Sequence, residues 1–182
     1  DVMQSPQQVL FYNLKGASYA NSLQIDFNYE IIKHFNLRTA YKYYDISTDY
    51  LSGSFQRPLQ AKHRFFGNLE YETHIKEKGK QWKFDFTWNW LGKQQLPTTA
   101  TNPVDDRLPE FSPSFSVMNT QITRTFSSVF EVYIGGENIG NYRQQNAILG
   151  EHNPFGTHFD TSIVYAPIFG QMYYAGLRFK IK

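Results

Sequence analysis

The sequence predicts an all-β protein whose strands form an antiparallel transmembrane β-barrel, and three observations lead to this fold class. Apolar and polar residues alternate in one segment after another, which is the period of a β-strand. Short and long connections alternate along the chain, as in barrels with tight turns on one rim and long loops on the other. Tryptophan lies near the ends of its segment, where girdles of interfacial aromatic residues are expected.

About eight segments have the strand period, each close to the roughly 9 to 11 residues that a tilted strand needs to cross a bilayer. The clearest is 81–91, in which five aromatic residues alternate with polar ones. Segments 115–126 and 129–138 alternate less regularly, and no segment has a convincing helical period. In chain order, the predicted strands are 8–14, 22–32, 37–44, 67–73, 81–91, 115–126, 129–138 and 173–182.

The connections between these strands are sorted by length. Every second one is short, and those between them are long and rich in Gly, Pro, Asn and Asp. A soluble sandwich has no reason to sort its loops in this way, so the pattern favours a barrel with its long loops on the extracellular side. The short connections are 33–36, 74–81 and 127–128, and the long ones are 45–60, 92–114 and 139–170.

Segment 81–91 also predicts which side of the barrel wall meets lipid. A Trp ring tolerates the half-wet headgroup zone, where its N–H finds a partner. The polar row carries full charges, which suit a hydrated lumen. A soluble β-sandwich, or a lipocalin-like barrel whose aromatic face lines a core, has the same alternation and stays open as an alternative. The predicted lipid-facing residues are Trp82, Phe84, Phe86, Trp88 and Trp90, and the predicted lumen-facing ones are Lys83, Asp85, Thr87 and Asn89.

Composition argues against several other classes. No apolar run approaches the ~20 residues of a membrane-spanning helix, and mean hydropathy is negative. The absence of cysteine rules out disulfide and thiolate sites. With 18 basic and 16 acidic residues and no dense basic cluster, nucleic acid is not an expected partner. No catalytic set, metal-ligand spacing or cofactor motif stands out, so we expect neither an enzyme nor a cofactor.

Five residues of the long loops are candidates for contact with a ligand, although each would equally serve to anchor its loop. His152 and His158 share one loop with Glu151 and Asp160. That set can contact a metal or a metal chelate, but polar residues in a solvated loop give the same pattern. The five candidates are Arg107, Tyr142, Arg143, His152 and His158.

The C-terminal part of the chain resembles a known family. Residues 135–139 read Gly-Gly-Glu-Asn-Ile, which fits a Gly-x-Glu-Asn-[Leu/Ile] pattern, and residues 174–179 read Tyr-Ala-Gly-Leu-Arg-Phe. Both segments resemble the end of TonB-dependent outer-membrane receptors, particularly those of Bacteroidetes-type bacteria. Segments 19–45, 58–73 and 82–99 resemble the same family. The resemblance therefore covers essentially the whole chain.

The last strand also resembles the signal that the barrel-assembly machinery of the outer membrane recognises. In that signal a polar residue and a glycine are followed by hydrophobic residues, with an aromatic residue near the end. This chain departs from the common form because Ile181 and Lys182 close it. The matching residues are Tyr174, Gly176, Leu177, Phe179 and Ile181.

The resemblance implies a barrel of about 22 strands, filled by an N-terminal plug domain and preceded by a TonB-binding segment. Residues 1–182 would be a single unit, the C-terminal part of that barrel, with the plug and the TonB-binding segment absent. The implied location is the outer membrane of a Gram-negative bacterium. The implied partners are outer-membrane lipid, the rest of the barrel and plug, the TonB complex, the barrel-assembly machinery and a small nutrient.

The function implied by the resemblance is active import of a scarce nutrient, such as an iron or other metal chelate, a cofactor or an oligosaccharide. The outer loops would capture it, and TonB would move the plug. The alternative is a complete eight-stranded barrel that anchors or adheres, since about eight strands can close around a side-chain-filled interior. A barrel enzyme is disfavoured, because no nucleophile and base can be placed. Pairing of the first strand with the last would separate the two barrel hypotheses.

Overall fold

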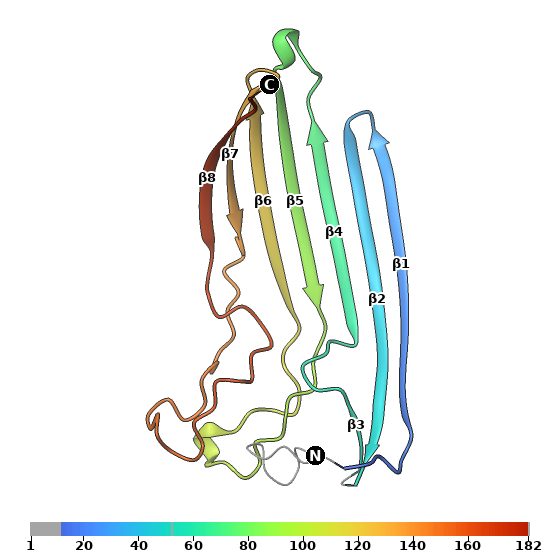
Figure 1. Ribbon diagram of the computed structural model, residues 1–182, viewed down its shortest axis with the longest axis vertical. Coiled ribbons are helices and arrows are strands. Elements are labelled where there is room, and N and C mark those ends of the chain that lie inside the picture. The colour runs from blue at the N-terminus through green and yellow to red at the C-terminus, as the bar shows by residue number, and fades with distance from the viewer. Residues whose placement is uncertain (1–11, 52, 182) are drawn as a thin grey trace.

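A computed structural model describes residues 12–51 and 53–181, and within them the chain forms one antiparallel sheet (Figure 1). The strands are long because alternating β-branched, aromatic and polar residues favour a pleated backbone over a helical one. This confirms the all-β, antiparallel prediction. The strands are β1 (Ser18–Ile32), β2 (Phe35–Tyr50), β3 (Gly53–Gln56), β4 (His63–Glu72), β5 (Gln81–Leu91), β6 (Phe115–Thr125), β7 (Phe130–Glu137) and β8 (Met172–Phe179).

The sheet is a meander with two free edges. Its order is β1-β2-β4-β5-β6-β7-β8, and the short strand β3 pairs with the end of β2. Within the described residues β1 and β8 pair with one neighbour each and not with each other. The sheet is therefore open, and the closure expected of a barrel is not observed in this chain.

Several of the predicted boundaries are wrong: β1 and β4 each begin four residues earlier than predicted, β8 ends at Phe179, and two segments differ more. Of the first predicted strand, 8–14, residues 8–11 lie outside the described residues, and 12–14 belong to no strand. The segment 45–60, expected to be a loop, instead continues β2 as far as Tyr50 and folds back as β3. The ladder between Ser47 and Gln56 satisfies backbone groups that a loop would leave to water.

Helical structure is limited to two single turns in the described part of the chain. They are the 3₁₀ helices η1 (Glu77–Gly79) and η2 (Val104–Asp106), and both lie in connections. No helix of the described residues is long and apolar enough to cross a membrane.

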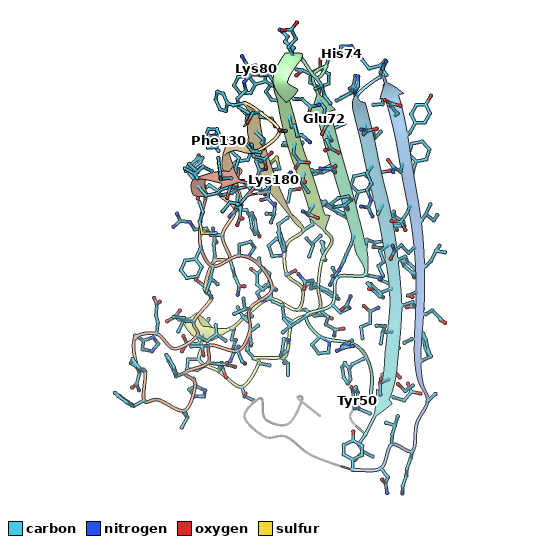
Figure 2. The ribbon with its side chains drawn as sticks, turned by 45° about the horizontal axis from the view of Figure 1, so that its top comes forward. Tyr50, Glu72, His74, Lys80, Phe130 and Lys180 are labelled. Atoms are coloured by element: carbon cyan, nitrogen blue, oxygen red, sulfur yellow. The ribbon has the colours of Figure 1, made fainter. Side chains whose placement is uncertain are left out.

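The two ends of the sheet differ, as the pattern of connections predicts. Figure 1 shows the connections after β1, β4 and β6 at the upper end, and the long connections after β2, β5 and β7 gathered at the lower end. In Figure 2, Glu72, His74, Lys80, Phe130 and Lys180 lie at the short-turn end, with Tyr50 at the opposite one. The structure thus confirms that the long loops share one end.

Strand register keeps one face apolar and the other polar across the sheet. Between β4 and β5, Leu69 pairs with Phe86 and Tyr71 with Phe84, whereas Glu72 pairs with Lys83. Because side chains alternate along each strand, a slip of one residue would exchange the faces. We call these the apolar face and the polar face of the sheet.

The apolar face is the more exposed one. On β5, Trp82 and Trp88 are 41% and 38% exposed, whereas Gln81 and Thr123 of the polar face are each 7% exposed. Most of the buried hydrophobic residues lie outside the strands, in the long connections. Those in the described residues are Ala61, Leu96, Phe115, Leu149, Ile163 and Ala166.

Candidate functional site

The three long connections pack together into one structure, the loop cluster, formed by residues 57–62, 92–114 and 138–171. A single backbone bridge joins Ala61 to Gln94 of the next connection, and another, between Leu149 and Asp160, lies within the last connection. The Leu59 N–H donates to the Gln95 carbonyl across 2.9 Å. These bonds satisfy backbone groups of irregular segments, so the loops are held against one another.

A small apolar core lies inside the loop cluster. Leu96, Leu149 and Ile163 are each only 4% exposed and pack against one another, although Leu96 is far from the other two in the sequence. Leu59, Leu108 and Tyr165 pack around them. Burying apolar side chains from distant segments stabilises their mutual arrangement.

Two buried glutamines hold the backbone around this core. Gln144 accepts hydrogen bonds from the Tyr165 N–H at 2.8 Å and the Ala166 N–H at 3.2 Å, and donates to the Ile163 carbonyl at 2.7 Å. Gln94 donates to the Tyr165 carbonyl at 3.0 Å. A side-chain amide offers donors and an acceptor on one rigid group, so it can bond several backbone groups at once. The sequence offered no signal for the role of Gln94.

Asn138 explains part of the Gly-Gly-Glu-Asn-Ile motif. Its backbone has φ of 49°, a left-handed conformation that asparagine tolerates better than most residues. Its side chain donates to the Tyr142 and Phe169 carbonyls at 2.8 and 3.2 Å and accepts from the Tyr142 N–H at 3.1 Å. Asn138 therefore fastens the end of β7 to both ends of the last long loop.

Asp106 connects two of the long loops. It lies in η2 and is 7% exposed, and its carboxylate accepts from the Gly150 N–H at 3.1 Å. The imidazole of His152 lies 4.0 Å from the other carboxylate oxygen. The hydrogen bond from Gly150 gives Asp106 an anchoring role between connections 92–114 and 138–171, whereas the His152 side chain is largely exposed.

A pocket of about 420 Å³ opens in the loop cluster beside β3. The polar groups on its wall are those of Gln56, Thr98, Arg107 and Glu110, among others. The Arg107 Nε donates to the Asn102 carbonyl at 2.8 Å, which holds the guanidinium in place. A concave apolar site with a few fixed polar groups is the usual form of a small-molecule site. The apolar wall is formed by Phe55, Pro58, Leu96, Pro97, Leu108 and Pro109.

The five predicted ligand-contact residues do not share one site. Of them, only Arg107 lines the pocket of about 420 Å³. Tyr142 stacks on Phe115 with ring centroids 4.8 Å apart, and Arg143 bonds Asn141. The backbone of His158 lies close to Gly150. Within the described residues, no three His, Asp or Glu side chains are grouped as a metal site.

The tyrosines of the loop cluster are neutral. Burial raises the pKa of the Tyr142 hydroxyl. Burial also raises the pKa of Tyr165, and the neighbouring Tyr142 raises it further. Since both values lie above the ordinary value, these groups act as hydrogen-bonding hydroxyls rather than as bases.

The predicted lipid-facing aromatic residues lie together on the apolar face of β5, as the register requires. Trp82 stacks on Phe84 with centroids 6.2 Å apart. The Arg124 guanidinium lies 4.8 Å from the centre of the Trp82 ring, a cation–π contact. This row is Trp82, Phe84, Phe86, Trp88 and Trp90.

The predicted assembly residues lie in β8, except Ile181, which follows its end. Two of them take part in a reciprocal arrangement. The Tyr174 ring covers Gly135 and the Tyr133 ring covers Gly176, so that a Cβ at either glycine would overlap the ring. The Tyr174 hydroxyl also donates to Gln121 at 3.0 Å. Gly135 lies within β7, inside the predicted strand 129–138.

The polar face carries its own hydrogen-bond network. Asn68 donates to Asp85 at 2.9 Å and to Thr87 at 3.1 Å, and Lys83 lies 2.7 Å from Glu72. Near the β8 edge of the same face, Glu131 of β7 pairs with Arg178 of β8. Polar groups on this face thus satisfy one another along and across the strands.

Comparison of the chain with family models, with curated proteins and with solved structures gives no match.

Proposed function

We propose that this chain is the C-terminal part of the barrel of a TonB-dependent nutrient receptor in the outer membrane. Its apolar face would meet lipid and its polar face the lumen. The pocket of the loop cluster would take part in capturing the nutrient on the outside of the cell. The observation that carries the proposal is that the apolar face of the sheet is its exposed face.

A water-soluble sheet would reverse this exposure. In such a sheet the apolar face packs on a core and the polar face meets water. Here Phe84 and Ile122, which pair across β5 and β6 on the apolar face, are each 38% exposed, whereas Gln81 and Thr123 of the polar face are each 7% exposed. Large exposed apolar patches mark contact with protein or membrane.

The height of the apolar row suits a bilayer. Trp82 and Trp90 are the first and last aromatic residues of β5, and eight steps at ~3.4 Å each separate them by about 27 Å along the strand, or about 19 to 22 Å across the membrane at the usual tilt of a barrel strand. The apolar band of an outer-membrane barrel is roughly 25 Å tall, with aromatic residues at both boundaries. Arg124 beside Trp82 would reach the headgroup zone with its charged end.

The open edges favour the receptor over the small self-contained barrel. Unpaired backbone groups on β1 and β8 would be costly in lipid, where every N–H and C=O needs a partner. Further strands of a larger barrel would supply those partners. A closed eight-stranded barrel would pair β1 with β8, which the described residues do not do.

Membrane insertion is tested on the full-length gene product by electrophoresis with and without boiling. A stable barrel in detergent migrates differently from the boiled, unfolded chain. We expect a heat-dependent shift in the outer-membrane fraction. A protein found in the soluble fraction, with one band in both lanes, would contradict the proposal.

Ligand capture is tested by thermal-shift measurement of the purified receptor against ferric chelates, corrinoids and oligosaccharides. We expect one class to raise the melting temperature, and Arg107→Gln to weaken that effect. Arg143→Gln is the matched control, because Arg143 is exposed and does not line the pocket. If both variants lost the thermal shift equally, or if neither variant changed it, the pocket would have no part in ligand capture.

A further inference from the structure

A second pocket, of about 510 Å³, lies where the apolar face of β5 meets the loop cluster. Its lining includes Trp90, the last aromatic residue of the β5 row, and Phe111, which is 42% exposed. The row continues toward the middle of the sheet through Trp88, whose ring centroid lies 5.2 Å from that of Phe65. One wall of this pocket is therefore continuous with the apolar face.

The opposite wall is cationic. Lys62 and Lys93 both line the pocket, and no carboxylate is among its described lining residues. Asp45 lies 3.3 Å from the Lys62 ammonium, which also lies 5.9 Å from the Tyr43 ring. The hydrogen bond to Asp45 raises the pKa of Lys62, so the ammonium stays charged. Its remaining N–H groups can donate to a second anion.

Lys93 adds a charge that the protein leaves uncompensated. Its side chain is exposed and has no ion pair with the described residues. His63 supplies a further polar group, since its Nδ1 lies 2.7 Å from the Tyr41 hydroxyl. When that hydroxyl donates, the ring proton lies on Nε2, which becomes a hydrogen-bond donor.

We propose that this pocket binds the phosphate headgroup of a membrane lipid, with the acyl chains lying along the apolar face beside Trp90. Two ammonium groups and an imidazole suit a phosphate, and the aromatic wall next to them suits a hydrocarbon chain. A free phosphate would use only the two lysines and the imidazole. The inference rests on the proposed membrane location, which places this pocket at the outer headgroup level, where amphipathic aromatic residues are enriched.

The test uses the full-length gene product in detergent micelles and counts bound lipid by native mass spectrometry. The probe is dioleoylphosphatidic acid, dioleoylglycerol has the same chains without the phosphate, and inorganic phosphate has no chains. We expect phosphatidic acid to bind and the other two not to. The double variant Lys62→Gln/Lys93→Gln should bind it roughly thirtyfold more weakly, because each of the two lysines near a phosphate surface contributes on the order of 1 kcal/mol.

Two controls separate charge at this pocket from charge in general. Lys76→Gln/Lys80→Gln makes the same change at the opposite, short-turn end of the sheet, and should leave binding within about twofold. Lys62→Arg/Lys93→Arg keeps the charge and should keep binding, which excludes a folding defect as the cause. Equal weakening at both ends, binding of dioleoylglycerol, or displacement of the lipid by equimolar inorganic phosphate would overturn the inference. A heat-shifted receptor that binds no lipid would overturn it while leaving the proposed function intact.

Discussion

The sheet and the loop cluster are stabilised in opposite ways. The loop cluster buries Leu96, Leu149 and Ile163 and surrounds them with satisfied amides. The sheet exposes its apolar side chains and pairs its polar ones with each other. The loop cluster therefore has a core of its own, whereas the sheet needs an apolar environment outside it.

This difference separates two kinds of substitution. A charge placed on the apolar face would destabilise the sheet only if the environment of that face excludes water. A cavity made inside the loop cluster would destabilise that cluster in any environment. Comparing the two kinds of substitution in one protein therefore shows whether the apolar face of the sheet meets water or an apolar environment. The substitutions below follow in order from the largest expected effect to the smallest.

The largest effect is expected from Phe86→Lys, at the middle of the β5 row. A lysine there would cost roughly 2 to 4 kcal/mol near the bilayer midplane. Asn89→Lys on the polar face is the control, and it suits the purpose better than Asp85→Lys, because Asp85 already accepts hydrogen bonds from Asn68 and Thr87. Folding yield into lipid vesicles is the measurement, and similar yields for both variants would contradict the predicted facing.

Leu149→Ala should destabilise the loop cluster by about 2 to 3 kcal/mol, since it removes a buried side chain and leaves a cavity. The sheet should assemble as before, so the heat-dependent gel shift is expected to persist. Limited proteolysis should then cut the long loops faster than in the unchanged protein. Loss of assembly together with the loop would show that the two regions do not fold independently.

Asn138→Ala should cost about 1 to 3 kcal/mol in the loop cluster, because buried backbone groups at Tyr142 lose their partner. Asn138→Asp is the matched variant. It keeps the acceptor for the Tyr142 N–H but loses the donor for the Tyr142 and Phe169 carbonyls, so an intermediate effect is expected. Hydrogen exchange of the Tyr142 amide measures both, and unchanged protection in the alanine variant would count against this role.

The smallest effect is expected on the polar face. Lys83→Met breaks the pair with Glu72, both side chains being partly exposed. Such pairs contribute roughly 0.2 to 1 kcal/mol, so folding yield should fall slightly and the loss should shrink at high salt. A loss as large as that of Phe86→Lys would mean that the polar face does not meet water.

The strands could be predicted from the sequence because their signal is local. The aromatic residues of 81–91 recur at every second position, and the ladder partners repeat the pattern. The short strand β3 lacks that signal, since four residues with a glycine give no measurable period. It forms because the far end of β2 offers a free edge.

The site was less accessible to prediction, because its contacts join distant residues. Gln94 bonds Tyr165 across 71 positions, and nothing near Gln94 in the sequence marks that role. Arg107 was identified as a candidate from its loop position, but Phe55 and Gln56, which also line the pocket, come from β3. Tyr142 was identified for its chemistry, yet its ring stacks on Phe115.

The central claim is that the apolar face of the sheet meets lipid, and site-directed spin labelling tests it most directly. The 182 residues contain no cysteine. In a series of variants, each with one cysteine at a position from 83 to 88, the spin label is therefore attached at a single known point of this segment. In the full-length protein in vesicles, labels at Phe84, Phe86 and Trp88 should be accessible to oxygen, and those at Lys83, Asp85 and Thr87 to a water-soluble nickel complex. Labels at 84, 86 and 88 that are shielded from both reagents would show an apolar face buried in a protein core, and would contradict the account.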